Sequence, residues 1–212
     1  MEDLKKMSLK ELEDLCGDIR SEIIEVVCKN GGHLGPNLGV VELSTALHYV
    51  YNSPVDKIVW DVGHQSYVHK MLTGRRDRFH TIRKRGGLGP FTDPNESIHD
   101  QFISGHAGSA LSVSAGLAAA NPDKNVAVVI GDASFANGTT LEALNDINGK
   151  LKNLTIIIND NEMSIGENVG AISGILNKVI NSSFYLKLRK DLRYVLSRYN
   201  LTKPIVKPTE RV

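Results

Sequence analysis

The chain has 212 residues, of which 41% are hydrophobic, so it is long enough to bury one sizeable core. Its 25 basic and 24 acidic residues nearly cancel, which argues against nucleic acid or a membrane surface as a partner. There is no apolar run of the roughly 20 residues that span a bilayer, no signal-peptide pattern, and no C-x-x-C spacing of Cys16 and Cys28. We therefore expect a cytoplasmic protein with reduced thiols that serve as apolar filling.

The N-terminal part of the sequence predicts two helices, a strand and a long loop region. A first helix is expected over 9–30, because Ser8 begins a capping box and apolar residues follow at helical spacing. A second helix is expected over 41–51, and a β-branched run predicts a strand over 57–62. Repeated turn signals make 63–104 irregular, and a loop region of that length is more often functional than incidental.

The next part predicts a strand–helix–strand unit. The Ala-rich segment 109–120 suits a helix packed closely on a sheet, and VAVVI at 126–130 reads as a strand buried on both faces. A helix over 139–147 and a second buried strand, LTIII at 154–158, follow. This spacing indicates a right-handed crossover. We therefore predict an α/β fold with an open, mainly parallel sheet and helices on both faces.

The C-terminal segment differs in kind from the rest. Apolar residues fall on one stripe of a predicted helix over 183–199, and basic residues occupy its other faces. A solvated basic face over a stripe that points to the core is favoured over a membrane contact. We expect an α/β domain over 1–181, then this basic amphipathic helix and a truncated linker over 182–212.

Polar residues follow the two buried strands at matching places. Asp132 comes after the first strand and Asn161 after the second, 29 positions later in the chain. Because ligands bind outside the carboxyl ends of parallel strands, these two oxygen donors are expected to converge on one Mg²⁺ ion. Each residue alone is an ordinary turn or cap residue. Together they match the diphosphate motif of thiamine-diphosphate enzymes, Gly-Asp-Gly followed by Asn-Asn or Asn-Asp-Asn.

The resemblance extends over most of the chain from Asn30 to Ala171. It rests on the stretches GGHL (31–34), VEL (41–43), ALHYVY (46–51), WDVGHQ (60–65), LTGRR (72–76), NDNEMSI (159–165) and ENVGA (167–171). In these stretches the chain resembles the N-terminal part of the 1-deoxy-D-xylulose-5-phosphate synthase family, which is related to transketolase. The run WDVGHQ-x-Y-x-HK-x-LTGRR favours the synthases over transketolase itself.

The resemblance implies a set of site residues. The side chains of Asp132 and Asn161 and the carbonyl of Met163 would hold Mg²⁺. Thiamine diphosphate would be bound by His64, Gly105, His106, Ala107, Ala133, Ser134 and Asn161. His33 and His64 would be the catalytic residues, since an imidazole titrates near neutrality and can transfer protons.

Two stretches depart from the family pattern. The usual Gly-Asp-Gly is Gly-Asp-Ala here, which costs about 1 kcal/mol if Ala133 needs a positive φ and nothing otherwise; we expect no cost. The sequence GHAGSA at 105–110 lacks hydroxyls, so backbone amides would carry more of the diphosphate contacts. The other noted histidines, His48, His80 and His99, are expected at the surface or behind the site residues. For Arg75 and Arg76 a structural or surface role is favoured over binding of a substrate phosphate.

The implied reaction condenses pyruvate with glyceraldehyde 3-phosphate, with loss of CO₂, in a homodimeric enzyme that serves isoprenoid, thiamine and pyridoxal biosynthesis. Family members also need a pyrimidine-binding domain, which nothing in this sequence resembles. We therefore expect a clipped fragment, an N-terminal subunit or a free-standing relative, and no activity from this chain alone. Two alternatives remain: a transketolase-type N-terminal subunit, or a catalytically silent relative that acts as a binding or assembly module.

Overall fold

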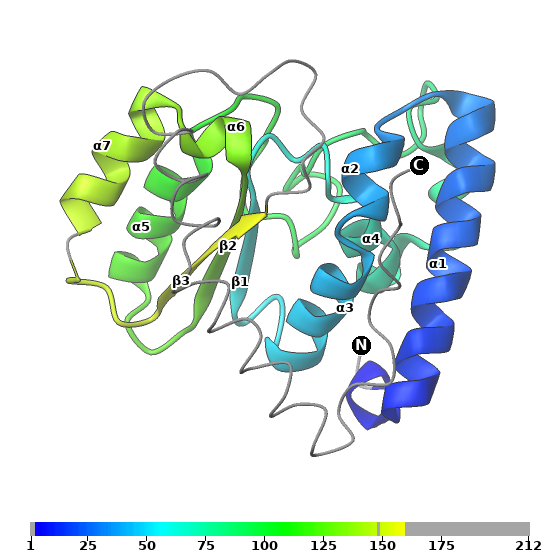
Figure 1. Cartoon of the computed structure of the whole chain (residues 1–212), viewed down its shortest axis with the longest axis horizontal. Helices are drawn as coiled ribbons and strands as arrows, with labels where there is room; N and C mark the ends of the chain where they lie inside the picture. Colours follow the sequence, from blue (N-terminus) through cyan, green and yellow to red (C-terminus); the bar gives the residue numbers. More distant parts are fainter. Residues whose placement is uncertain (1–2, 148, 160–212) are drawn as a thin grey trace, which may run out of the picture. The chain divides into compact units, whose positions relative to one another are not determined.

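The structure is a computed structural model, and it describes residues 3–147 and 149–159. This part of the chain forms an α/β fold (Figure 1). In chain order its elements are η1 (Leu4–Lys6), α1 (Leu9–Asn30), α2 (Leu34–Leu38), α3 (Val41–Val50), β1 (Lys57–Trp60), α4 (Tyr67–Lys70), η2 (Met71–Arg75), η3 (Phe79–Thr81), α5 (Ala110–Ala120), β2 (Val126–Gly131), α6 (Asp132–Phe135), α7 (Gly138–Ile147) and β3 (Leu154–Asn159). The predicted helix and linker over 182–212 lie outside the described residues.

The sheet has three parallel strands in the order β1-β2-β3. Val126 of β2 lies opposite both Lys57 of β1 and Leu154 of β3, and Gly131 lies opposite Asn159 where β2 and β3 end. The central strand β2 is buried from Val126 to Ile130 because it has a neighbour on each edge and helices on each face. The predicted parallel sheet, and the neighbouring positions of its two apolar strands, are confirmed.

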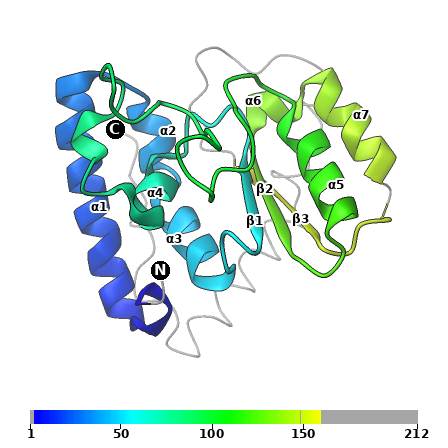
Figure 2. The same ribbon diagram turned by 180° about the vertical axis from the view of Figure 1, so that it is seen from behind.

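Helices cover both faces of the sheet, as predicted. Helices α5 and α7 lie on one side, while α1, α2, α3 and α4 lie on the other (Figures 1 and 2). Leu47 of α3 packs against Trp60, Ala127 and Val129 of the first two strands. Helix α1 lies outside α3, and its apolar stripe packs in a second cluster that includes Tyr67. Within the described part of the chain, no helix is long and apolar enough to cross a membrane.

The first helix begins and ends where the sequence predicts. Ser8 Oγ accepts a hydrogen bond from the Glu11 N–H (3.4 Å), and the Glu11 carboxylate accepts one from the Ser8 N–H (2.7 Å). Gly31, with φ +73°, ends the helix after Asn30. Helix α2 was not predicted, because its five residues, LGPNL, are too short to show helical periodicity.

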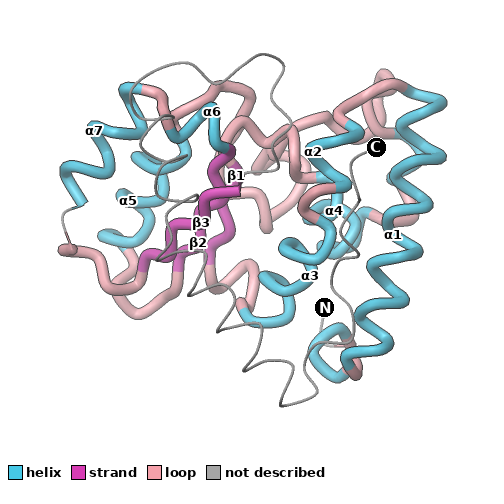
Figure 3. Tube along the Cα trace, in the orientation of Figure 1, coloured by secondary structure: helices cyan, strands magenta, loops and turns pink. Residues whose placement is uncertain are grey.

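The segment between β1 and α5 is mostly loop, as predicted (Figure 3), and buried charges hold it together. The Asp100 carboxylate accepts two hydrogen bonds from the Arg75 guanidinium (2.8 Å each) and one from His69 Nε2 (3.0 Å). Glu96 pairs with Lys70 and with Arg75. Burial alone would raise the pKa of Asp100, but the hydrogen bonds from His69 and Arg75 hold that pKa far below its usual range.

This cluster shows which of the two expected positions His48 takes, and it supports the prediction about Arg75. His48 does not lie on the surface: it is buried and shares a 2.9 Å hydrogen bond with His69 Nδ1. Burial, followed by the charge of His69, lowers the pKa of His48 well below its usual value. Arg75 is structural, as expected.

Of the two cysteines only Cys16 is buried. The prediction that Cys28 is apolar filling is wrong, because its side of α1 faces solvent.

Candidate functional site

The carboxyl edge of the sheet gathers the predicted binding residues that the structure describes. Asp132 directly follows Gly131 of β2, and Gly131 lies opposite Asn159, the last residue of β3. Ligands of parallel α/β proteins bind outside this edge. Asp132 is therefore placed where a diphosphate-bound metal is expected. The other two predicted metal ligands, Asn161 and Met163, lie outside the described residues.

A buried carboxylate fixes the loop before α5 to the end of β1. Asp61, immediately after β1, accepts hydrogen bonds from the Gly108 N–H (3.0 Å) and the Ala110 N–H (3.3 Å). This contact holds the first turn of α5, and with it the preceding loop 105–107, at the carboxyl edge of the sheet. Asp61 was not predicted as a site residue, although it lies in the WDVGHQ stretch that carries the family resemblance.

The same loop touches the connection after β2. Gly108 has φ +89°, and a β-carbon there would lie 2.6 Å from Asn137 Cγ, so this approach of the two segments requires glycine. Thr140 Oγ1 contacts the carbonyl of Gly108 (3.3 Å) and that of Ser134 (2.8 Å). The structure therefore brings the two predicted diphosphate-binding segments together. Of their residues, Ser134 is buried, Gly105 is half-buried, and three are exposed, namely His106, Ala107 and Ala133.

The Gly-Asp-Ala departure carries no backbone penalty. Among the described non-glycine residues, only Val62 and Arg83 have a positive φ. Ala133 lies in α6 with its methyl group at the surface, so it adopts an ordinary helical conformation. The expectation that this substitution is harmless to the backbone is confirmed.

The two predicted catalytic histidines lie next to each other. The ring centroids of His33 and His64 are 5.7 Å apart at an angle of 80°, and the ring of Phe91 lies 5.9 Å from that of His33. Burial, and then the charge of Arg83, lowers the pKa of His33. Burial, and then the charge of His33, lowers the pKa of His64. Both pKa shifts favour the neutral imidazole, which offers one donor and one acceptor nitrogen.

A tight turn after β1 presents His64. The Gly63 N–H donates to the Asp61 carbonyl (2.6 Å) across Val62, whose φ is +59°. A β-branched residue seldom adopts this conformation, and such strain persists only where the surroundings determine the backbone. Gly63 itself has φ +79°, and a β-carbon there would overlap the Ser104 hydroxyl. Glycine at position 63 is therefore required by both conformation and space.

Two buried polar atoms of the His64 loop have no hydrogen-bond partner among the described residues. They are His64 Nδ1 and Gln65 Nε2. The other amide atom of Gln65, Oε1, accepts from Asn159 Nδ2 (3.3 Å), which ties this loop to the end of β3. Unpartnered buried polar atoms are rare in folded proteins and often mark the place of a ligand. A polar ligand at the carboxyl edge of the sheet would satisfy them.

The donor set at this edge fits the expected ion. Over 3–147 and 149–159, no three His, Cys, Asp or Glu side chains gather in a group that would hold a metal by itself. The predicted metal ligand in this part of the chain is the Asp132 carboxylate, whose oxygens suit Mg²⁺ because that ion takes few protein oxygens and completes its shell with phosphate and water. The backbone N–H groups of the 105–107 loop suit the diphosphate.

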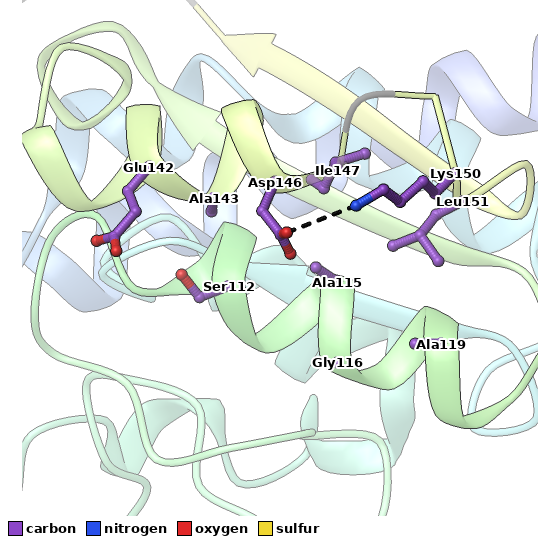
Figure 4. A pocket seen from close by; sticks show the side chains of 10 residues that line it. All are labelled: Ser112, Ala115, Gly116, Ala119, Glu142, Ala143, Asp146, Ile147, Lys150 and Leu151. Atoms are coloured by element: carbon purple, nitrogen blue, oxygen red, sulfur yellow. Dashed lines mark ion pairs between the residues drawn. The ribbon is translucent and has the colours of Figure 1, made fainter.

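A groove of about 610 Å³ lies away from this edge, between α5 and α7 (Figure 4). Its walls are mostly small side chains of α5 and polar side chains of α7, including Asp146, which forms a 3.8 Å ion pair with Lys150. None of the predicted site residues lines it. The groove is therefore separate from the candidate site at the carboxyl edge of the sheet.

The parallel sheet, the Gly-Asp pair at its carboxyl edge, the glycine-rich loop beside it and the two adjacent histidines are consistent with the fold of a thiamine-diphosphate-binding α/β domain. Comparison with known families makes the assignment specific. The family model described as 1-deoxy-D-xylulose-5-phosphate synthase matches residues 1–212, and the chain belongs to this family.

Individual relatives agree with the family match. The chain is 57% identical over 190 residues to the 1-deoxy-D-xylulose-5-phosphate synthase of Fusobacterium nucleatum subsp. nucleatum, covering 89% of this chain and 32% of that protein. It is 50% identical over 209 residues to the synthase of Caldanaerobacter subterraneus subsp. tengcongensis, covering 97% of this chain and 33% of the relative. The synthase of Alkaliphilus oremlandii is 49% identical over 216 residues, 100% of this chain and 35% of the relative. The chain thus spans about a third of the length of these relatives.

Proposed function

We propose that this chain supplies the part of a 1-deoxy-D-xylulose-5-phosphate synthase that binds the diphosphate of thiamine diphosphate and its Mg²⁺ ion. The intact enzyme would condense pyruvate with glyceraldehyde 3-phosphate, with loss of CO₂, for isoprenoid, thiamine and pyridoxal biosynthesis. The observation that carries the proposal is the paired ends of β2 and β3, with Asp132 following Gly131 beside Asn159. The family match over the whole chain supports it.

Each part of the site has a task in this proposal. Asp132, with Asn161 and the Met163 carbonyl, would hold Mg²⁺, and the amides of the 105–107 loop would bind the diphosphate. When bound, thiamine diphosphate supplies the nucleophilic carbon and the electron sink for decarboxylation. His33 and His64, in which the neutral imidazole is favoured, would hold and move protons on the substrate oxygens at the mouth of the site.

The remaining parts of the enzyme are also proposals. Because the relatives are about three times as long as this chain, we propose that the pocket for the pyrimidine ring comes from a region outside it. A homodimer in the cytoplasm is the assembly that we expect. The ordinary backbone of Ala133 removes one reason for the alternative of a catalytically silent module, and the match to the synthase family favours a synthase over a transketolase.

Replacement of Asp132 by alanine tests the proposed function. The assay uses a fusion enzyme in which this chain replaces the matching N-terminal third of the Fusobacterium nucleatum synthase. Substitutions that only disturb the support of a metal ligand commonly cost 10–100-fold, so loss of a ligand should lower turnover, or raise the Mg²⁺ concentration needed for it, by about 100-fold or more. Turnover is measured as product formed at a series of Mg²⁺ concentrations.

Asp123→Ala is the matched control, since Asp123 is an exposed aspartate in the turn before β2, at the opposite edge of the sheet. Its Mg²⁺ dependence should equal that of the unaltered fusion. Unchanged turnover and Mg²⁺ dependence in Asp132→Ala would contradict the metal assignment. An unaltered fusion that folds and binds the cofactor but makes no product would contradict the proposed synthase function.

A further inference from the structure

One buried amide joins the backbone of the two predicted catalytic histidines. Asn37 lies in α2 and is fully buried. Its Nδ2 group donates to the carbonyl of His33 and to the carbonyl of His64, each at 2.7 Å. Its Oδ1 atom accepts from the N–H of Tyr67 at 2.9 Å. Both amide hydrogens and the amide oxygen are therefore used, and each partner is a backbone group.

The contacts of Asn37 supply a constraint that the neighbouring backbone lacks. His33 follows Gly31 and Gly32, and His64 follows Gly63, and all three glycines have a positive φ. Glycines give a chain conformational freedom, so a histidine beside them is held in place only by contacts from elsewhere. The Asn37 amide binds the carbonyls of His33 and His64, which are far apart in the chain, and so holds them close together.

Tyr67 extends this constraint to a side chain. Its N–H is held by Asn37, and its hydroxyl lies 3.5 Å from both the backbone nitrogen and the Nδ1 atom of His33. Asn37 thereby sets the backbone of both histidines and the tyrosine that lies against one imidazole. The two rings that follow from this backbone arrangement have their centroids 5.7 Å apart.

We propose that Asn37 is a positioning residue for the synthase reaction: it sets the distance between His33 and His64 without contacting substrate or cofactor. The proposal rests on the proposed function only in calling the two rings catalytic. Aspartate is the informative replacement, because it has nearly the same shape but lacks the two amide hydrogens that Asn37 donates to the carbonyls of His33 and His64. Asn37→Asp therefore removes the constraint without leaving a cavity.

Nuclear magnetic resonance of the 212-residue chain tests directly how close the rings of His33 and His64 lie. In the unaltered chain, cross-relaxation between ring protons of His33 and His64 is expected. Asn37→Asp should abolish this signal and move the imidazole resonances of both residues. Asn37→Ala, which adds no buried charge, should do the same and serves if the aspartate variant fails to fold. Retention of the ring–ring signal in a folded Asn37 variant would overturn the proposal.

Asn153→Asp is the matched control. Asn153 is also an amide clamp, donating to the carbonyls of Ala118 (3.0 Å), Asn121 (3.0 Å) and Lys124 (2.9 Å), but it lies before β3, at the opposite edge of the sheet. Its variant should retain the ring–ring signal. A variant at position 153 that loses this signal as Asn37→Asp does would show a general loss of structure and would overturn the specific role.

Activity gives a second, separate readout in the fusion enzyme. Misplacement of a reacting group by about 1 Å costs about 100-fold in rate, so Asn37→Asp should lower kcat by about that factor, with KM for pyruvate changed much less. Asn153→Asp should keep kcat within about twofold. A kcat for folded Asn37→Asp equal to that of Asn153→Asp would refute the role in catalysis. An inactive unaltered fusion would instead count against the proposed function, while the resonance experiment still decides the positioning.

Discussion

Replacement of Arg75 by methionine should lower the free energy of unfolding of this chain by about 3–5 kcal/mol. Arg75 is the cation between two acids: its guanidinium bonds Asp100 twice at 2.8 Å and Glu96 once at 2.8 Å. Methionine fills similar space but leaves the Asp100 carboxylate, whose side chain is 0% exposed, without its main counter-charge. Removing one partner of a buried ion pair costs this much because the other charge stays buried.

The neighbouring arginine is the control for this prediction. Arg76 pairs with Glu22 at 2.8 Å, but the two side chains are 40% and 28% exposed. Arg76→Met should therefore cost at most about 1 kcal/mol. Urea denaturation followed by circular dichroism measures both variants, with equal slopes showing that the unfolding reaction is the same. Losses of equal size in the two variants would mean that the buried cluster does not hold the loop segment.

Gly63→Ala is the second substitution with a large expected effect, a loss of about 3 kcal/mol in the free energy of unfolding. The positive φ of Gly63 accounts for about 1 kcal/mol of this. The remainder comes from overlap of the new methyl group with Ser104 and with the Thr92 backbone nitrogen at 3.2 Å, since overpacking a filled site costs about 1–3 kcal/mol. The same methyl group displaces the turn that presents His64, so turnover of the fusion enzyme should fall as well.

Gly74→Ala separates the two causes. Gly74 has φ +87°, close to that of Gly63, but nothing lies within 4 Å of a β-carbon there. Only the conformational cost of about 1 kcal/mol should remain, and turnover should be unchanged. Thermal or urea unfolding of the two variants gives the comparison. If Gly63→Ala lowers the free energy of unfolding no more than Gly74→Ala does, the turn after β1 can accommodate a methyl group and the prediction is wrong.

Local patterns in the sequence predicted the sheet and its edge. VAVVI and LTIII are continuous apolar runs separated by one helix, and this arrangement leads to parallel neighbours with their carboxyl ends together. The prediction that Asp132 lies at the carboxyl edge of the sheet was therefore correct. The expectation that Ala133 carries no backbone cost was also correct, because this residue lies in the helix α6 with an ordinary backbone conformation. These features depend on residues close together in the chain.

The buried polar groups were missed because their partners are far away in the chain. His48 meets His69, and Asp61 meets the loop before α5, across separations of 21 and 47 residues. A polar side chain is read as exposed unless its partner is known, and no local periodicity identifies such a partner. For the same reason the contacts of Asn37 with His33 and His64 could not be predicted. The sequence around it, Gly-Pro-Asn-Leu-Gly, is typical only of a turn.

The central claim is that the carboxyl edge of this sheet binds a metal–diphosphate pair, and paramagnetic broadening tests it most directly. Mn²⁺ takes the same oxygen ligands as Mg²⁺ and broadens the resonances of nearby amides. With thiamine diphosphate in excess, Mn²⁺ added to the labelled chain should broaden the amides of 105–108 and 131–135, leave those of α1 sharp, and lose this effect in Asp132→Ala. Sharp signals at 105–108 and 131–135 with Mn²⁺ and cofactor in excess would contradict the account.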